Sequence, residues 1–136
     1  EALRAAEILE KIGISVEVID LRSIKPIDYD TVFESVAKTG KLVVVDIGWY
    51  TGGIGGEIVA RVSEEMFSSL SVPPCRIALP DSPTPTSREL AKHYYPRAIH
   101  IAATIQKMLG HQVLDEEEKE PSIPLDVPDS SFKVPF

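Results

Sequence analysis

The stretch LVVVDIGWYTGGIGGE, residues 42–57, decides the fold of this chain. It begins with four consecutive strand-forming apolar residues and runs through a glycine-rich turn into a long amphipathic segment. This order indicates a strand, a turn and a helix. Because the apolar run does not alternate with polar residues, we expect a strand covered on both faces, as in a parallel sheet between two helical layers. The stretch therefore predicts an α/β domain.

The glycines of this turn have two interpretations. A glycine-rich turn before a helix can bind a phosphate through backbone N–H groups and the helix dipole. The spacing argues against this, because Ile58 stands where a dinucleotide fingerprint has its third glycine. The alternative is close approach of another backbone, with Gly52 and Gly56 on one smooth helix face. The candidates for a helix or subunit interface are Trp49, Gly52, Gly53, Gly55 and Gly56.

Residues 1–110 alternate helical and strand patterns around this stretch. We expect helices at residues 1–12, 29–39, 53–70, 87–94 and 97–109, and further strands at residues 15–21 and 75–79. Asp28 stands where it would cap the second helix. Because an α/β domain normally places a strand before its first helix, we expect the sequence to lack a first strand and a preceding domain.

Three segments carry a resemblance to a known family. DLRSIKPID (residues 20–28), KTGKLVVVDIGWYTGGIGGEI (38–58) and PDSPTP (80–85), in this order, closely resemble the C-terminal domain of the beta subunit of thiamine-diphosphate-dependent 2-oxo acid dehydrogenases. The resemblance implies a three-layer α/β/α domain with a mainly parallel central sheet. It also implies that thiamine diphosphate and Mg²⁺ bind elsewhere in the full enzyme, between the alpha subunit and the N-terminal domain of the beta subunit. No residue here matches a catalytic, cofactor-binding or metal-binding residue of the family.

The role that the resemblance implies is assembly. The expected partners are the alpha subunit or alpha domain, a second beta subunit and the lipoyl acyltransferase core of the complex. Members often dock that core through an acid in a Leu-Asp/Glu-Ala-Pro sequence, whereas this chain has Ser71, which cannot pair with an arginine as a carboxylate does. Ser71 and Phe136 remain the docking candidates. Arg22 matches a substrate-phosphate arginine of deoxyxylulose-phosphate synthases, but pairing with Asp20 or a neighbouring loop is the simpler expectation.

The remaining chemistry-bearing residues do not form a recognisable active site in the sequence. His93, His100 and His111 lack the i, i+4 spacing of a helical metal pair. We interpret the single cysteine, Cys75, as a buried apolar residue at the start of a predicted strand. The expected function is thus a domain of an enzyme that decarboxylates pyruvate or a branched-chain 2-oxo acid and transfers the acyl group to lipoyl-lysine. The alternatives are a transketolase or deoxyxylulose-phosphate synthase-like C-terminal domain, and a free-standing α/β binding module.

Composition separates a nearly neutral body from an acidic tail. Residues 111–136 carry a net charge of −5 out of −7 for the whole chain of 136 residues. No basic stripe or long apolar run is present, which argues against nucleic acid and membrane partners. With the resemblance, this indicates the bacterial cytoplasm or the mitochondrial matrix. We expect residues 111–136 to form a proline-rich arm that docks through Phe132, Val134 and Phe136, with the acidic cluster 115–120 in water.

Overall fold

A computed structural model describes residues 1–111 and 113 of the chain. The C-terminal arm and its apolar anchors lie almost entirely outside these residues. The elements along the described chain are α1 (Ala2–Glu10), α2 (Tyr29–Thr39), β1 (Val43–Trp49), α3 (Ile54–Met66), the 3-10 turn η1 (Phe67–Ser69), β2 (Cys75–Leu79), α4 (Arg88–Lys92) and α5 (Ala98–Met108).

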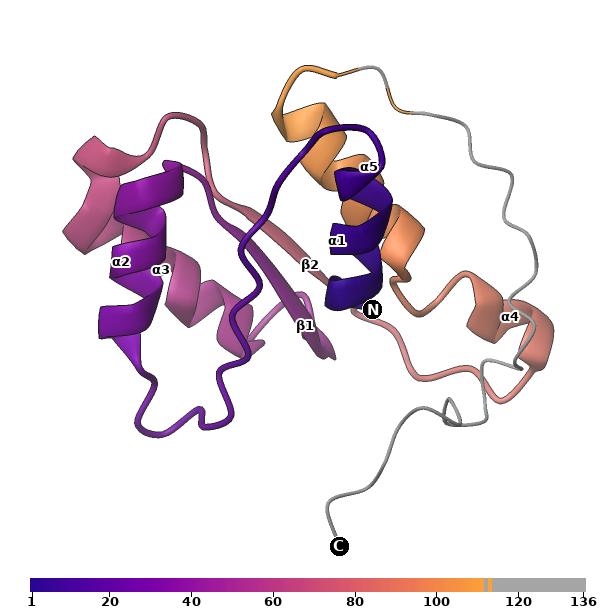
Figure 1. Cartoon of the computed structure of the whole chain (residues 1–136). Coiled ribbons are helices and arrows are strands. Elements are labelled where there is room, and N and C mark those ends of the chain that lie inside the picture. Colours follow the sequence, from indigo (N-terminus) through magenta and orange to yellow (C-terminus); the bar gives the residue numbers. More distant parts are fainter. Residues whose placement is uncertain (112, 114–136) are drawn as a thin grey trace, which may run out of the picture.

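The sheet consists of β1 and β2, which run parallel, with Val43 opposite Cys75 and Val45 opposite Ile77. A register irregularity lies between Val45 and Trp49. Helices α2 and α3 lie on one side of the two strands, and α1 and α5 lie on the other (Figure 1). The expected α/β class with a parallel sheet between helical layers is therefore confirmed.

Each side of the sheet has its own apolar core. On the α1 and α5 side, Ala5, Leu9 and Ile101 are buried, and Ile77 of β2 packs against them. On the α2 and α3 side, the buried residues are Val32, Val36, Ile58 and Val62, and Val44 of β1 packs against them. The spacing of four between Ile58 and Val62 predicts the buried stripe of α3 correctly.

Two helix boundaries show how local sequence sets the elements. Asp28 caps α2 by accepting a hydrogen bond from the backbone N–H of Thr31 at 3.1 Å, and the side chain of Thr31 donates to it at 2.6 Å. These bonds lower the pKa of Asp28. Gly40 ends the helix in the left-handed region at φ 67°. α3 stops at Met66, short of the expected residue 70.

Residues 15–21 do not form the expected strand. The segment runs without regular structure between α1 and α2, and the only ladder among the described residues joins β1 to β2. A strand needs a neighbour to take its backbone hydrogen bonds, and this segment has none within the described chain. Its apolar alternation indicated an extended conformation but did not supply that neighbour.

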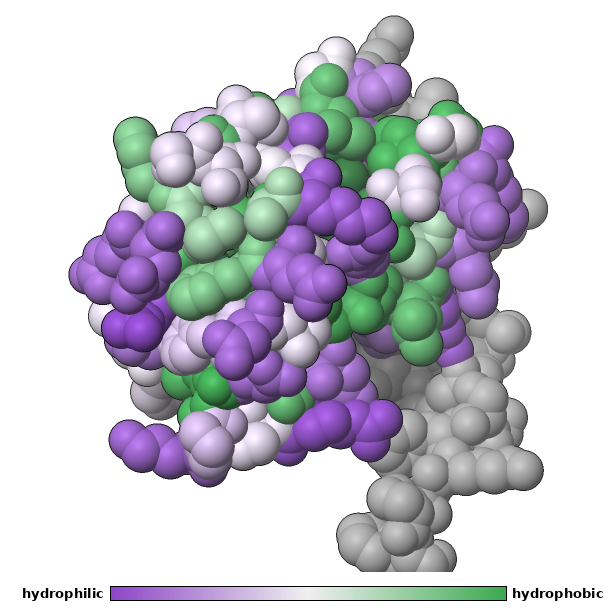
Figure 2. Space-filling view, turned by 60° about the vertical axis from the view of Figure 1, so that its left-hand side comes forward, coloured by the Kyte–Doolittle hydropathy of each residue, from purple (hydrophilic) through white to green (hydrophobic). Residues whose placement is uncertain are grey.

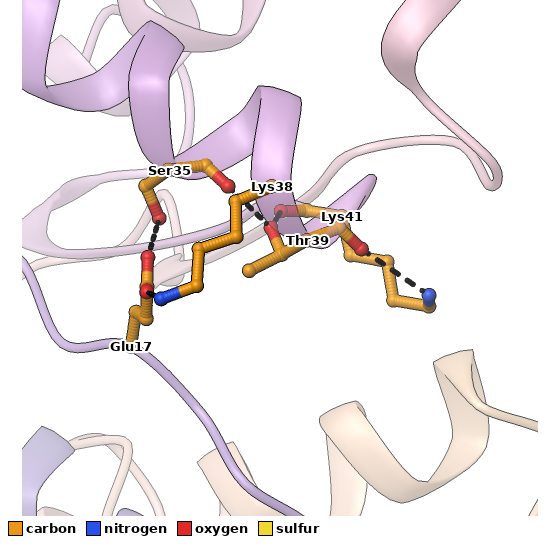
Figure 3. A network of polar contacts seen from close by, with 5 residues as sticks. All are labelled: Glu17, Ser35, Lys38, Thr39 and Lys41. Atoms are coloured by element: carbon orange, nitrogen blue, oxygen red, sulfur yellow. Dashed lines mark hydrogen bonds and ion pairs between the residues drawn. The ribbon is translucent and has the colours of Figure 1, made fainter.

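Side chains hold this segment to α2 instead. Glu17 accepts hydrogen bonds from Ser35 and from Lys38, which also forms an ion pair with it (Figure 3). The bond from Lys38 is the main reason that the pKa of Glu17 is lowered, and the same contact raises the pKa of Lys38. On the same helix, Thr39 donates to the carbonyl of Ser35 at 2.8 Å.

None of the helices within the described residues is long and apolar enough to cross a bilayer.

Candidate functional site

The carboxyl ends of β1 and β2 meet at one edge of the sheet, where parallel sheets generally place their ligand sites. Residues 50–53 follow β1, and the proline-rich segment after Leu79 follows β2. The sequence motifs containing GWYTGG and PDSPTP are thereby brought together. This edge is the candidate site.

Asp46 fills the position where a phosphate would bind. It accepts hydrogen bonds from the backbone N–H groups of Gly48 at 2.8 Å and Gly55 at 3.2 Å. A carboxylate at the start of α3 also interacts favourably with the helix dipole. Because the chain supplies its own anion there, the start of α3 does not fit a diphosphate group.

The glycines allow close packing within the chain. A Cβ atom on Gly53 would lie 2.4 Å from the carbonyl oxygen of Trp49, and one on Gly55 would lie 3.4 Å from Cγ1 of Val44. Gly53 begins the helix as its N-cap, so Gly52 is outside the helix, at φ 79° in the turn. The expectation that Gly52 and Gly56 share a helix face is therefore wrong, because the helix starts two residues after Gly52.

A hydrogen-bonded clamp joins the two loops of the site. Asp81 accepts hydrogen bonds from the backbone N–H of Thr51 at 2.9 Å and from its hydroxyl at 2.6 Å. The hydroxyl bond, followed by the backbone bond, lowers the pKa of Asp81. Beside the clamp, the guanidinium of Arg76 lies 4.1 Å from the ring centre of Tyr50 and donates to the Tyr50 carbonyl at 3.1 Å.

An open cavity of about 460 Å³ lies next to this clamp. It is lined by residues 78–80 and by Tyr50, Asp81, His93, Tyr94, Tyr95 and Pro96. Tyr94 is buried and donates its hydroxyl to the carbonyl of Ser82 at 2.8 Å, and the rings of Tyr94 and Tyr95 meet edge to face. Sequence reasoning did not single out this cluster. The available signal was that both loops follow parallel strands and must share an edge.

β1 exposes an apolar strip along its length. Val45, Ile47 and Trp49 alternate along the strand, and their exposed fractions are 39%, 85% and 57%. The expectation that both faces of β1 are covered is therefore wrong for this chain, because these three apolar side chains remain exposed. Hydrophobic surface also lies open between hydrophilic side chains in the space-filling view (Figure 2). Trp49, an interface candidate, belongs to this strip.

The other candidate residues lie apart from this edge. Arg22 pairs with Asp20, Nε to Oδ2 at 2.7 Å, as the simpler expectation held, and it adopts the left-handed φ of 57°. Ser71 is exposed, and both its N–H and its hydroxyl donate to the carbonyl of Gly40. Phe136 lies outside the described residues.

The described residues contain no group of three histidine, cysteine, aspartate or glutamate side chains that could hold a metal ion. His93 lines the cavity, whereas the ring of His100 accepts a hydrogen bond from the backbone of Arg97 at the start of α5. Cys75 is a free thiol, half-buried at the start of β2. Within the described residues, the two features left for contact with another molecule are the cavity and the exposed strip of β1.

Comparisons with known proteins agree with this picture. Residues 1–101 match the model of the family described as "Transketolase, C-terminal domain". The chain is 44% identical over 107 residues to the pyruvate dehydrogenase E1 component subunit beta of Rickettsia bellii, covering 79% of this chain and 33% of that one. The corresponding Bacillus subtilis subunit is 39% identical over 109 residues, covering 80% of this chain and 33% of that one.

A mitochondrial relative and a solved structure extend the comparison. The mitochondrial E1 beta subunit of Caenorhabditis elegans is 42% identical over 110 residues, which cover 80% of this chain and 31% of the subunit. A solved structure named "Split gene transketolase, inactive beta4 tetramer" aligns with a TM-score of 0.66 and 32% identity over 80% of this chain and 34% of its own. The chain spans about a third of these relatives. It belongs to the transketolase C-terminal domain family and, within it, resembles the pyruvate dehydrogenase E1 beta subunits.

Proposed function

We propose that this chain is the assembly domain of a thiamine-dependent 2-oxo acid dehydrogenase decarboxylase component. The observation that carries the proposal is the uncovered strip Val45, Ile47 and Trp49 in a chain whose relatives are subunits named for such an enzyme. Monomeric proteins seldom leave contiguous apolar surface open without a partner. The strip therefore supports a contact with an alpha subunit, an alpha domain or a second beta subunit.

The chemistry belongs to the rest of the enzyme in this proposal. The full enzyme would decarboxylate a 2-oxo acid and transfer the acyl group to lipoyl-lysine, and thiamine diphosphate with Mg²⁺ would supply that chemistry. The described residues do not fit the diphosphate, because Asp46 already accepts the N–H group that α3 offers near its start. We therefore assign no catalytic step to them. The proposed location is the bacterial cytoplasm or the mitochondrial matrix.

Docking of the lipoyl acyltransferase core is a separate part of the proposal. Ser71 stands at the position where the family resemblance expects this contact, and Phe136 is the second docking candidate. Ser71 is exposed, but its hydroxyl already donates a hydrogen bond to the Gly40 carbonyl. It can therefore offer a partner's arginine only the neutral hydroxyl oxygen as an acceptor. We expect this domain to dock the core without the usual acid-to-arginine pair.

An activity assay of the full enzyme in which we place this chain tests the proposal. With thiamine diphosphate, Mg²⁺ and an artificial electron acceptor, we expect turnover of pyruvate or of a branched-chain 2-oxo acid. The chain of 136 residues by itself should give no turnover above background. Transfer of a ketol group between sugar phosphates would instead support the transketolase-like alternative, which the name of the structural neighbour favours. Turnover by the isolated chain would contradict the assembly role.

A further inference from the structure

The cavity at the carboxyl edge of the sheet is lined by three tyrosine rings, of Tyr50, Tyr94 and Tyr95. The hydroxyl of Tyr94 is fixed on the carbonyl of Ser82, and Tyr94 in turn supports Tyr95 with ring centres 5.1 Å apart. On the opposite loop, Arg76 holds the ring of Tyr50. Pro80 and Pro96 add apolar surface to the lining, which also contains Asp81 and His93. Little side-chain freedom remains to be lost when such a surface binds another segment.

We propose that this cavity binds the proline-rich part of the chain's own C-terminal segment, residues 121–128. Its sequence is PSIPLDVP, with prolines at positions 121, 124 and 128 and a P-x-x-P spacing. Proline-rich segments favour the extended polyproline conformation and dock on grooves lined by aromatic rings. The prolines also restrict the unbound segment, so less conformational entropy is lost on binding.

The chain is long enough to make this contact. The cavity adjoins Pro96 at the start of α5, whereas the tail leaves from the other end of that helix. The 11 residues of α5 span ~16 Å at about 1.5 Å per residue. The ten residue-to-residue steps from His111 to Pro121 can extend to ~33 Å. The tail can therefore turn back along α5 and reach the cavity without strain.

Charge and hydrogen bonding suit the same segment. Residues 121–128 carry one charge, that of Asp126, so the acidic cluster 115–120 falls on the connecting stretch and can remain in water. In the cavity, the hydroxyls of Tyr50 and Tyr95 have no hydrogen-bond partner within the described part of the chain. They can donate to the backbone carbonyls that a polyproline segment leaves open.

Hydrogen exchange on the full chain tests this contact. We expect the amides of residues 78, 79, 81, 82 and 93–95 to exchange roughly 2- to 10-fold more slowly in the full chain than in a chain ending at Gly110, since this ratio corresponds to the free energy of one aromatic contact. The paired change Pro121→Ala with Pro124→Ala should remove this protection without touching the folded domain. Pro135→Ala serves as the matched control and should leave it unchanged. Tyr95→Ala should remove the protection from the cavity side.

Three results would overturn the proposal. The first is equal exchange in the full and shortened chains. The second is protection that survives the Pro121 and Pro124 changes, which would assign it to another part of the tail. The third is protection that disappears on dilution, which would show a segment of a second copy in the cavity. The test is independent of the proposed enzyme role, because it needs no cofactor, substrate or partner subunit.

Discussion

Gly53 and Gly56 lie three residues apart at the start of α3, yet they face different surroundings. A side chain on Gly53 would press on the backbone carbonyl of Trp49, which cannot move without distorting β1. A Cβ on Gly56 would meet only the end of the Arg76 side chain, at 3.2 Å. At the first position a Cβ would therefore meet backbone, and at the second it would meet one side-chain nitrogen, Nη1 of Arg76, which also donates to the Tyr50 carbonyl and would have to shift by a few tenths of an ångström.

This difference predicts opposite effects of the same substitution. Gly53→Ala should lower the free energy of unfolding by about 1–3 kcal/mol, the usual cost of overpacking. Gly56→Ala should leave it unchanged or raise it by up to ~1 kcal/mol, because alanine is the better helix former. Denaturant unfolding of both variants measures the two effects. Equal destabilisation would show that Arg76 cannot move aside.

Side-chain roles were predictable from the sequence where the partner is local. Asp28 precedes its helix and caps Thr31, three residues on, as the capping rule requires. Arg22 pairs with Asp20, two residues away. Asp46 bonds Gly55, nine residues away across a turn, and Asp81 bonds Thr51 from another loop. No sequence spacing encodes these two contacts, because the first depends on how α3 packs on β1 and the second on the pairing of β1 with β2.

At the scale of elements, the Thr51 and Asp81 clamp fixes the β1 loop against the β2 loop. Since the pKa of Asp81 is lowered in the folded chain, its carboxylate stabilises the fold above the ordinary pKa of 3.8, and this contribution is lost as the pH falls through the lowered value. Asp81→Asn should therefore lower the Tm at neutral pH, with a difference from the original chain that shrinks in acid. Thermal unfolding across this pH range measures it. A difference independent of pH would mean that the charge contributes nothing.

The segment 15–21 shows why one expected element was wrong. Its alternating pattern fits a strand, but a pattern cannot show whether a hydrogen-bonding neighbour is at hand. In the described chain, the Glu17 contacts with Ser35 and Lys38 hold the segment against α2 in place of a ladder. β1 and β2 were predicted closely because each supplies the other's partner.

The Glu17 network should therefore control local opening more than global stability. Glu17→Gln should speed hydrogen exchange in residues 14–21 and leave the Tm nearly unchanged, because exposed ion pairs contribute little to unfolding. High salt should reduce the difference between the two chains, since it screens the pair. Glu64→Gln makes the same charge change on an exposed face of α3 and is the control. If Glu17→Gln lowered the Tm clearly more than Glu64→Gln does, the network would act on global stability, which would contradict this local role.

At the scale of the molecule, the sequence predicts the helical layers but not the surface at the end of the sheet. The helical layers follow from periodicity within single segments, such as the stripe through Ile58 and Val62. The cavity and the bare strip depend on where segments distant in sequence end relative to one another. The apolar run of β1 predicted a strand correctly but not its burial, because Val45, Ile47 and Trp49 stay exposed in this chain.

The strip predicts how the isolated chain behaves in solution. Burying one large apolar side chain contributes about 1.5–3 kcal/mol, so a strip of three should drive association as concentration rises. Ile47→Lys places a charge in its centre and should shift sedimentation toward the monomer. Phe67→Lys is the matched control, because Phe67 is similarly exposed, at 77% against 85% for Ile47, but lies on η1, outside the strip. In the proposed full enzyme, Ile47→Lys should also weaken binding of the proposed alpha subunit, and Phe67→Lys should not. Equal effects of the two lysines would show that general surface hydrophobicity, and not this strip, forms the contact.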